Sequence, residues 1–196
     1  MDAGGEGATI AAAKLSWRER LRSARRARDS TELNAAAVAL ADRIAELCVS
    51  LDARRVACYL SRAEEPPTRS FLSWARDNAV TVLLPHSHAD GSLSWGVDDG
   101  TESVDDRAMP APGRVDLPPD ALGDVALALI PAAAIARDGT RLGWGAGYYD
   151  RALARLARRP PVYAVVFDDE FVEFLPREAH DIPVDGVVTP SGITVF

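Results

Sequence analysis

The sequence predicts an α/β fold in a single domain, with a mostly parallel central sheet flanked by helices. Apolar strand patterns alternate with helical patterns along the chain, and strands such as 125–130 and 162–167 are continuous apolar runs of the kind buried parallel strands show. A length of 196 residues is that of one domain with a substantial core. We place this domain at residues 11–196 and expect residues 1–10, which begin acidic and glycine-rich, to be a disordered tail.

The first half of the chain gives two helical patterns before its first strand. Trp17, Leu21 and Ala24 recur at helical spacing, and Ser30 or Thr31 is placed to cap the helix that follows. Beyond Pro66-Pro67 a third helical pattern precedes another strand. The expected elements, in order, are helices over 14–28 and 31–47, a strand at 55–60, a helix at 68–78, a strand at 80–84 closed by Pro85, and an edge or hairpin strand at 92–97.

The second half begins with a stretch rich in Pro, Gly and Asp, residues 98–124, which predicts a loop with one short strand near Val104. The most apolar strand follows and is ended by Pro131. The remaining expected elements are a strand at 125–130, a helix from Tyr148 to Arg158, a strand at 162–167, and terminal strands at 187–188 and 193–196.

Charge and composition limit the classes of function. The net charge of −7 argues against general nucleic-acid binding, and no apolar run reaches the length of a membrane span. The N-terminus lacks the basic flank and apolar core of a secretory signal. Cys48 and Cys58 have no metal-binding spacing and sit in apolar patterns, so we expect buried free thiols in a reducing cytoplasm.

Positive charge is concentrated near the N-terminus. Residues 14–28 contain Lys14 and six arginines against the single acid Glu19. This segment has three interpretations: a basic arm for nucleic acid, a solvated helix face, or a phosphate-binding first helix. Lys14 is the only lysine beside 21 arginines, which indicates a position that favours a compact ammonium over a planar guanidinium.

The most informative stretch is Arg141-Leu142-Gly143-Trp144-Gly145-Ala146-Gly147-Tyr148-Tyr149-Asp150-Arg151. It follows a strand pattern and opens a helical one, where glycine N–H groups and a helix N-terminus suit a phosphate. Asp150 can hold a divalent cation against phosphate oxygens, and Arg141 and Arg151 can neutralise them. Its G-x-G-x-G spacing is neither a Walker loop nor a Rossmann turn.

This string resembles the R-L-G-x-G-x-G-Y-Y-D-R pattern of the 5-formyltetrahydrofolate cyclo-ligase family, also called methenyltetrahydrofolate synthetase. Lys14-x-x-x-Arg18 resembles that family's N-terminal ATP-binding helix, and 59–68 resembles its folate-binding segment. Phe174-Leu175-Pro176-x-x-x-His180-Asp181 resembles its C-terminal segment.

The resemblance implies ATP- and Mg²⁺-dependent conversion of 5-formyltetrahydrofolate to 5,10-methenyltetrahydrofolate, with ADP and phosphate released. It implies substrate contacts from Leu60, Glu65 and Tyr148, and magnesium ligation by Asp150 and Asp181. Arg141 and Tyr148 are then catalytic. The implied nucleotide-binding residues are Lys14, Arg18, Gly143, Trp144, Gly145, Ala146, Gly147, Tyr149 and Arg151, although Tyr149 is also expected to pack inward. We expect a monomer whose partner is the small-molecule substrate, with no nucleic acid and no membrane.

Several alternatives remain open at this point. The chain can instead be a non-catalytic nucleic-acid or partner-binding module that uses its arginine-rich helix, or a different nucleotide-dependent kinase or ligase. Glu65 can be an acid that stabilises a helix N-terminus, and Asp181 a structural cap. His86 and His88 can form a metal-binding pair, but no third ligand is evident in the sequence.

Overall fold

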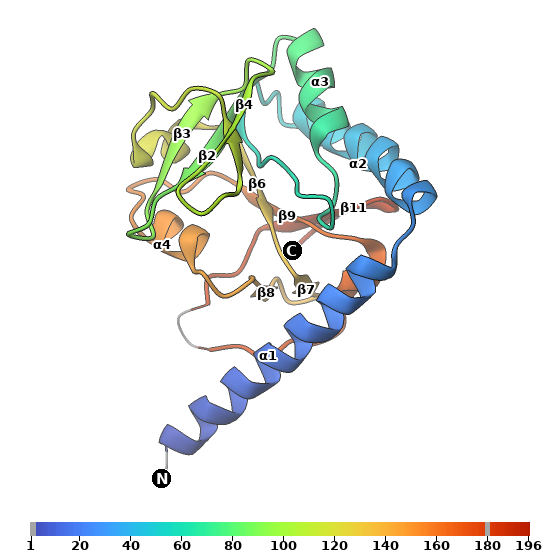
Figure 1. Ribbon diagram of the computed structural model, residues 1–196, viewed down its shortest axis with the longest axis vertical. Helices are drawn as coiled ribbons and strands as arrows, with labels where there is room; N and C mark the ends of the chain where they lie inside the picture. Colours follow the sequence, from blue (N-terminus) through green and yellow to red (C-terminus); the bar gives the residue numbers. More distant parts are fainter. Residues whose placement is uncertain (1–2, 179–180) are drawn as a thin grey trace.

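The computed structural model, which describes residues 3–178 and 181–196, has a seven-stranded central sheet with helices on both faces (Figure 1). The strand order is β12-β11-β9-β6-β1-β2-β3, in which the five inner strands are parallel and each edge strand is antiparallel to its neighbour. The predicted fold class is therefore confirmed. The bounds are β1 (Arg55–Ala57), β2 (Thr81–Ser87), β3 (Leu93–Val97), β6 (Leu127–Pro131), β9 (Val162–Val165), β11 (Gly186–Thr189) and β12 (Gly192–Val195).

Four α-helices and two small sheets surround the central sheet. The helices are α1 (Ala3–Ala27), α2 (Ser30–Ser50), α3 (Arg69–Asp77) and α4 (Tyr148–Ala154), with short 3₁₀ helices at Pro119–Asp124 and Asp168–Glu170. One small sheet pairs β4 (Glu102–Val104) with β5 (Pro110–Pro112). The other contains β10 (Phe171–Val172), β7 (Ala134–Ala136) and β8 (Arg141–Leu142).

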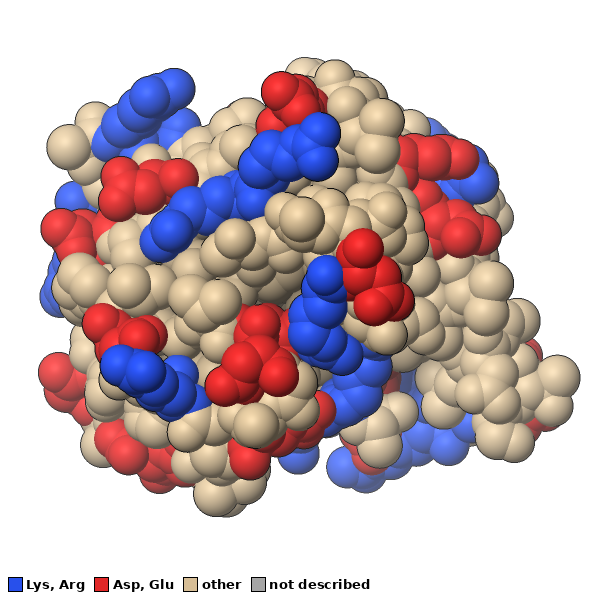
Figure 2. Space-filling model, turned by 90° about the horizontal axis from the view of Figure 1, so that it is seen from above, with Lys and Arg blue, Asp and Glu red and all other residues tan. Residues whose placement is uncertain are grey.

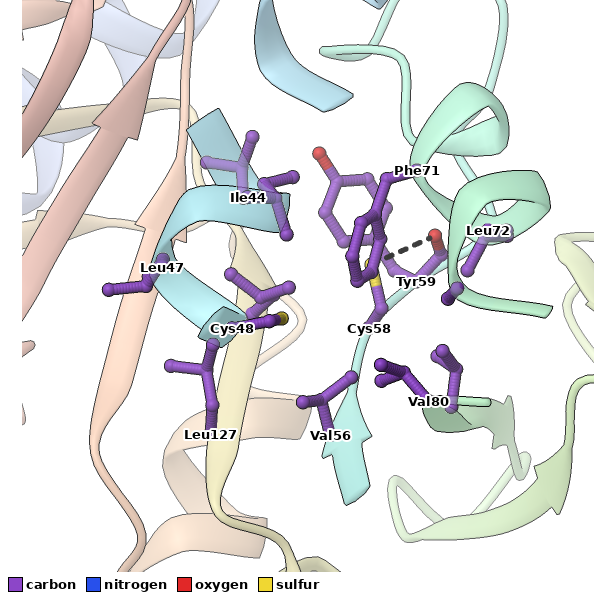
Figure 3. Close-up of a cluster of buried hydrophobic side chains, with 14 of the residues drawn as sticks. Ile44, Leu47, Cys48, Val56, Cys58, Tyr59, Phe71, Leu72, Val80 and Leu127 are labelled. Atoms are coloured by element: carbon purple, nitrogen blue, oxygen red, sulfur yellow. Dashed lines mark hydrogen bonds between the residues drawn. The ribbon is translucent and has the colours of Figure 1, made fainter. Parts of the chain in front are cut away.

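Alternation along the inner strands divides the core into two layers. On β6, Leu127 and Leu129 face the layer formed with α2 and α3, whereas Ala128 and Ile130 face the layer that includes Leu122 and Leu153. Figure 3 shows part of the first layer, with Ile44 and Leu47 of α2 on one side, Phe71 and Leu72 of α3 on the other, and Cys58 and Tyr59 between them. The continuous apolar runs in the sequence follow from this burial on both faces.

The sheet has a switch point between β1 and β6. From β1 the chain continues outward through β2 to β3, whereas from β6 it continues in the opposite direction through β9 to β11. The segments that leave the carboxyl ends of β1 and β6 therefore diverge above adjacent strands. In open α/β sheets the crevice at such a point is where ligands bind.

Helix α1 crosses below β7 and β8 (Figure 1) and is anchored there by a buried ion pair. Arg25 donates to both carboxylate oxygens of Glu170, at 2.6 and 2.7 Å, and its Nη2 also donates to the carbonyl of Ala132 at 2.8 Å. Both side chains of the pair are 1% exposed. Leu21 adds an apolar contact with the cluster around Leu142. These contacts fix one face of α1 against the loops at the end of the sheet.

Three local expectations are wrong. Residues 3–10 are helical rather than a disordered tail, because α1 extends back to Ala3 through the helix-favouring residues Ala11–Ala13; residues 1–2 lie outside the described part. The cap of α2 is Asp29, whose carboxylate accepts from the amides of Thr31 and Glu32. Strand β2 continues past Pro85 in its pairing with β3. Its pairing with β1 ends at Leu83, so the N–H that Pro85 lacks is not needed for a hydrogen bond to β1.

Cys48 and Cys58 are buried free thiols, as expected. Cys58 points its sulfur toward the carbonyl oxygen of Tyr59, 3.7 Å away (Figure 3). Burial raises the pKa of Cys48 to about 12 and raises that of Cys58 as well, so neither thiol is a reactive thiolate.

Among the described residues, no helix is both long enough and apolar enough to span a bilayer.

The ion pair that anchors α1 gives a stability prediction. Glu170→Ala leaves Arg25 buried without its counter-charge, so we expect the free energy of unfolding to fall by about 3–5 kcal/mol. Glu173→Ala is the matched control, since Glu173 is exposed and pairs with exposed Arg137; its expected effect is within about 0.5 kcal/mol. Urea unfolding of both variants is the measurement. Equal losses at the two positions would contradict the anchoring role.

Candidate active site

The glycine loop joins β8 to α4 and leaves little room for side chains. Gly145 and Gly147 have φ values of 102° and 68°, a left-handed conformation that favours glycine. A Cβ at Gly143 would lie 2.9 Å from Nη1 of Arg141, and one at Gly147 would lie 2.8 Å from Nη1 of Arg151. A Cβ at Gly145 would lie 3.5 Å from Cζ of Arg18. Gly143 and Gly147 therefore make space for the guanidinium groups of Arg141 and Arg151, while Gly145 is required by its backbone conformation.

Arg141 and Asp150 form an ion pair at the base of this loop. Arg141 comes from β8, Asp150 from the first turn of α4, and Nη2 donates to Oδ1 at 2.6 Å. The Arg141 side chain is 5% exposed and that of Asp150 is 34% exposed. Within the described residues, Oδ2 of Asp150 receives no hydrogen bond. The pair thus presents one accessible carboxylate oxygen beside a positive charge.

Lys14 and Arg18 reach the same region from successive turns of α1. Lys14 donates to Asp181 at 2.6 Å and to Glu178 at 2.7 Å, and Arg18 donates to the carbonyl of Gly143 at 2.8 Å. Burial lowers the pKa of Lys14, but the bonds to the two acids outweigh it and the net shift is upward. Lys14 is therefore a buried, charged group rather than part of a solvated face.

Arg151 and the two tyrosines connect the loop to its surroundings. Arg151 donates to the carbonyls of Ala146 and Gly91, so it braces the loop against the β2–β3 turn. The Tyr148 hydroxyl donates to the carbonyl of His88 at 2.9 Å. Tyr149 packs against the core layer below, and burial raises its pKa. Tyr149 thus lies inward, in line with its expected packing.

A cavity of about 250 Å³ lies between the glycine loop and the segment that follows β1. Trp144 forms one wall, with the guanidinium carbons of Arg22 and Arg25 5.2 and 4.9 Å from its ring centroid. A second hollow of about 410 Å³ shares Arg62, Ala63 and Glu65 with the first. The remaining residues of the first cavity are Glu64 and Met109.

Glu65 is the acid common to both hollows. Its Oε2 accepts from the amide of Arg62 at 2.9 Å, which fixes the turn after β1. Burial raises its pKa, although the Arg62 amide and the charge of Arg25 oppose the shift. Leu60, expected to contact substrate, is buried in the first core layer and is not among the residues that line either hollow.

The sequence-predicted residues therefore form two groups rather than one. Lys14, Arg18, Arg141, Asp150 and Arg151 surround the glycine loop, while Glu65 faces Trp144 across the cavity. Asp181 contacts Lys14 directly, and neighbouring His180 lies outside the described residues.

Sequence reasoning missed several residues of the cavity wall. Arg22 and Arg25 continue the stripe that Arg18 begins, at i+4 and i+7 along α1, and this spacing was the available signal. Met109 lies between β4 and β5, in the stretch expected to be mostly loop, and nothing in its local sequence marks it.

The site therefore combines an arginine-lined glycine loop with an adjoining cavity, and comparisons with known proteins identify the family. The model of the 5-formyltetrahydrofolate cyclo-ligase family matches residues 10–190. A protein of Mycolicibacterium smegmatis named 5-formyltetrahydrofolate cyclo-ligase is 34% identical over 73% of this chain and 77% of its own. One of the same name from Escherichia coli is 32% identical over 72% and 80%. The chain therefore belongs to the 5-formyltetrahydrofolate cyclo-ligase family.

Solved structures share the fold. The NMR structure of 5,10-methenyltetrahydrofolate synthetase from Aquifex aeolicus superimposes with a TM-score of 0.79, at 23% identity over 93% of this chain and 92% of that one. A 5,10-methenyltetrahydrofolate synthetase from Mycoplasma pneumoniae superimposes with a TM-score of 0.69, at 21% identity over 89% and 97%.

The two acids around Lys14 give the second prediction. Lys14→Ala removes a buried ammonium whose partners are partly solvated, so we expect about 1–2 kcal/mol of destabilisation together with weaker ATP binding. Arg20→Ala is the control, because exposed Arg20 makes no hydrogen bond or ion pair with the described residues and stacks on Trp17, its neighbour on the helix. Calorimetric ATP titration and thermal unfolding measure both effects. A general basic face would instead give equal changes at the two positions.

Proposed function

We propose that this chain converts 5-formyltetrahydrofolate and ATP to 5,10-methenyltetrahydrofolate, ADP and phosphate. The observation that supports this most is the juxtaposition of an arginine-lined glycine loop with the Glu65 cavity, joined through Trp144. A reaction between a phosphate donor and a folate needs two such compartments in contact. Family membership supports the same assignment.

The chemistry assigns a task to each compartment. A formamide oxygen is a poor leaving group, and transfer of the γ-phosphoryl group to it creates a good one. N10 of the folate then attacks the formyl carbon, closes the ring and expels phosphate. Such a sequence requires positioning and charge stabilisation rather than a protein nucleophile. The two buried thiols are accordingly not needed.

The nucleotide's phosphates belong, in this proposal, at the glycine loop. The amides of Gly143, Gly145 and Gly147, with Ala146 between them, approach a ligand closely because no Cβ intervenes. Lys14, Arg18 and Arg141 supply positive charge, and Arg151 braces the loop. We assign Tyr148, at the start of α4, to the contact with the substrate where the formyl oxygen meets the γ-phosphate.

Asp150 fits a magnesium ion. Its Oδ1 is fixed by Arg141, its carboxylate is partly exposed, and magnesium is commonly bound by one or two carboxylates together with substrate phosphates. Bound there, magnesium would neutralise charge on the phosphates. Asp181 was the other expected ligand; since its carboxylate contacts Lys14, we assign it the positioning of that ammonium.

The folate belongs in the Glu65 cavity. A pterin presents an amino group and an adjacent ring N–H, which one carboxylate can accept together. Trp144 offers a flat face for the ring, and exposed Arg62 offers a positive charge to the carboxylates of the glutamate tail.

Nothing in the structure favours the alternative of a nucleic-acid-binding module. Arginines of the N-terminal segment bond to the protein itself: in α1, Arg18 to Gly143, Arg25 to Glu170 and Arg26 to Glu64, and just after α1, Arg28 to Asp169. On the face shown in Figure 2, acidic and basic side chains are interspersed rather than gathered by sign. A phosphate backbone favours continuous positive charge.

The direct test of the proposed function is an absorbance assay for methenyltetrahydrofolate on mixing the protein, Mg-ATP and 5-formyltetrahydrofolate. We expect product that requires all three components and an equal amount of ADP. A rate of ATP hydrolysis that is the same with and without 5-formyltetrahydrofolate would indicate a different nucleotide-dependent enzyme. Salt-sensitive polynucleotide binding without turnover would support the binding module.

The metal assignment predicts different behaviour for two aspartates. Asp150→Asn should lower turnover by about 10²-fold, because removal of a preorganised electrostatic group typically costs that much. It should also raise the Mg²⁺ concentration needed for half-maximal rate. Asp181→Asn should weaken ATP binding and leave that Mg²⁺ requirement unchanged. Turnover measured across a Mg²⁺ titration separates them; an unshifted requirement in Asp150→Asn would remove Asp150 from the metal site.

The folate assignment predicts a selective effect at Glu65. Glu65→Gln keeps the shape but replaces an acceptor with a donor, so the KM for 5-formyltetrahydrofolate should rise about 10- to 100-fold, or about 1.4–2.8 kcal/mol. ATP affinity without folate should be unchanged. The substrate needs the ionised carboxylate, whose pKa is raised, so the wild-type KM should increase as pH falls toward that pKa, beginning above 4.5. A folate KM that is unchanged while ATP binding falls would make Glu65 a loop-ordering residue.

A further inference from the structure

Two histidines at the end of β2 and an aspartate from another turn lie around one point. His86 and His88 sit two residues apart at the end of β2, so their side chains share a face, and their ring centroids are 4.9 Å apart. Asp106 comes from the turn between β4 and β5. The ligand atoms of the three side chains all lie within 4.8 Å of one another. The third ligand missing from the sequence pattern is thus provided by the small hairpin.

The separations between these side chains are too long for hydrogen bonds and fit a shared ion. Nε2 of His86 lies 3.6 Å from Oδ1 of Asp106, and Nδ1 of His88 lies 3.5 Å from Oδ2. Hydrogen bonds of this kind span about 2.7–3.2 Å. Ligands about 2.0–2.1 Å from a tetrahedral zinc ion are separated by about 3.4 Å. The two separations from Asp106 are therefore close to the edges of such a coordination shell, and the remaining pair of ligand atoms lies within 4.8 Å.

Surrounding groups orient two of the three side chains, since Oδ2 of Asp106 accepts from the amide of Ala89 at 3.3 Å and His88 contacts Ser94. Nε2 of His88 lies 2.7 Å from the hydroxyl of Ser94, which leaves Nδ1 to face Asp106. Asp105 accepts from the amides of Ser87, Arg107 and Met109 and so ties the hairpin to the end of β2. His86 makes no side-chain hydrogen bond with any described residue, and its Nδ1 is buried.

We propose that His86, His88 and Asp106 form a binding site for a divalent transition metal ion of the zinc class. Two imidazoles and one carboxylate suit Zn²⁺ or Co²⁺ rather than Mg²⁺, which prefers oxygen ligands. Three protein ligands leave a fourth position for water, and the exposed fractions of 17%, 36% and 48% for His86, His88 and Asp106 make the site accessible.

The site is separate from Asp150 but is linked to the proposed active site through the backbone. The carbonyl of His88 accepts from Tyr148, and the carbonyl of Gly91 on the same turn accepts from Arg151. A metal ion bound by His88 therefore stabilises the turn whose carbonyls accept hydrogen bonds from Tyr148 and Arg151.

The test is a Zn²⁺ titration of chelator-treated full-length protein in excess Mg²⁺, which saturates sites made of carboxylates alone. We expect one equivalent of Zn²⁺ to bind and to raise the melting temperature. Substituted Co²⁺ should give the intense visible absorption of a four-coordinate ion with nitrogen ligands. No stoichiometric binding, or only the weak spectrum of a hydrated Co²⁺ ion, would overturn the proposal.

Variants test which side chains bind the ion. His86→Gln and His88→Gln should abolish stoichiometric Zn²⁺ binding, and Asp106→Asn should weaken it at least 10-fold. Asp116→Asn is the matched control, because Asp116 is also partly exposed and pairs only with Arg114 among the described side chains; it should bind as wild type does. Circular dichroism checks folding, and the wild-type Co²⁺ spectrum is decisive if a variant fails to fold. Unchanged affinity in folded His86→Gln and His88→Gln would place the ion elsewhere.

Discussion

The buried pair of Arg25 and Glu170 is the contact on which the proposed active site depends. It fixes α1, a helix from the start of the chain, to a short 3₁₀ helix that begins three residues after β9. The two residues are 145 positions apart in the sequence. Because α1 is rigid along its length, fixing Arg25 also determines where Lys14, Arg18 and Arg22 lie. The part of the positive charge beside the glycine loop that comes from α1 is therefore a consequence of helix docking.

The glycines and arginines of the loop depend on each other. Three guanidinium groups approach the loop: a Cβ at Gly143 or Gly147 would collide with Arg141 or Arg151, and one at Gly145 would contact Arg18 at van der Waals distance. Two of them, Arg141 and Arg151, come from the loop's own strand and helix, and the third comes from α1. The loop thereby concentrates positive charge beside its own amides, and only Asp150 among its residues balances it. This arrangement favours a polyanion such as a nucleotide triphosphate over a neutral ligand.

Much of the fold could be predicted from the sequence, because the parallel strands are buried on both faces and read as apolar runs. Strands of two or three residues such as β7, β8 and β10 are too short to show a period, and the loop stretch 98–124 concealed the β4–β5 hairpin that contributes Met109 and Asp106. The motif residues could be found because they are contiguous.

Long-range partners could not be found in the same way. Lys14 could be singled out as the only lysine, but its contacts with Glu178 and Asp181 join opposite ends of the chain and leave no local pattern. The family resemblance implied a substrate contact for Leu60, whereas its side chain is buried in the first core layer, which depends on packing with distant segments.

The most direct measurement is a crystal structure of the protein with Mg²⁺ and a non-hydrolysable ATP analogue. We expect the phosphates against the amides of residues 143–147, within hydrogen-bond distance of Arg18 or Arg141, with the metal ion on Asp150. Trp144 should separate the nucleotide from the Glu65 cavity. A nucleotide bound away from the glycine loop, or one that leaves α1 without a contact, would contradict this assembly of the site.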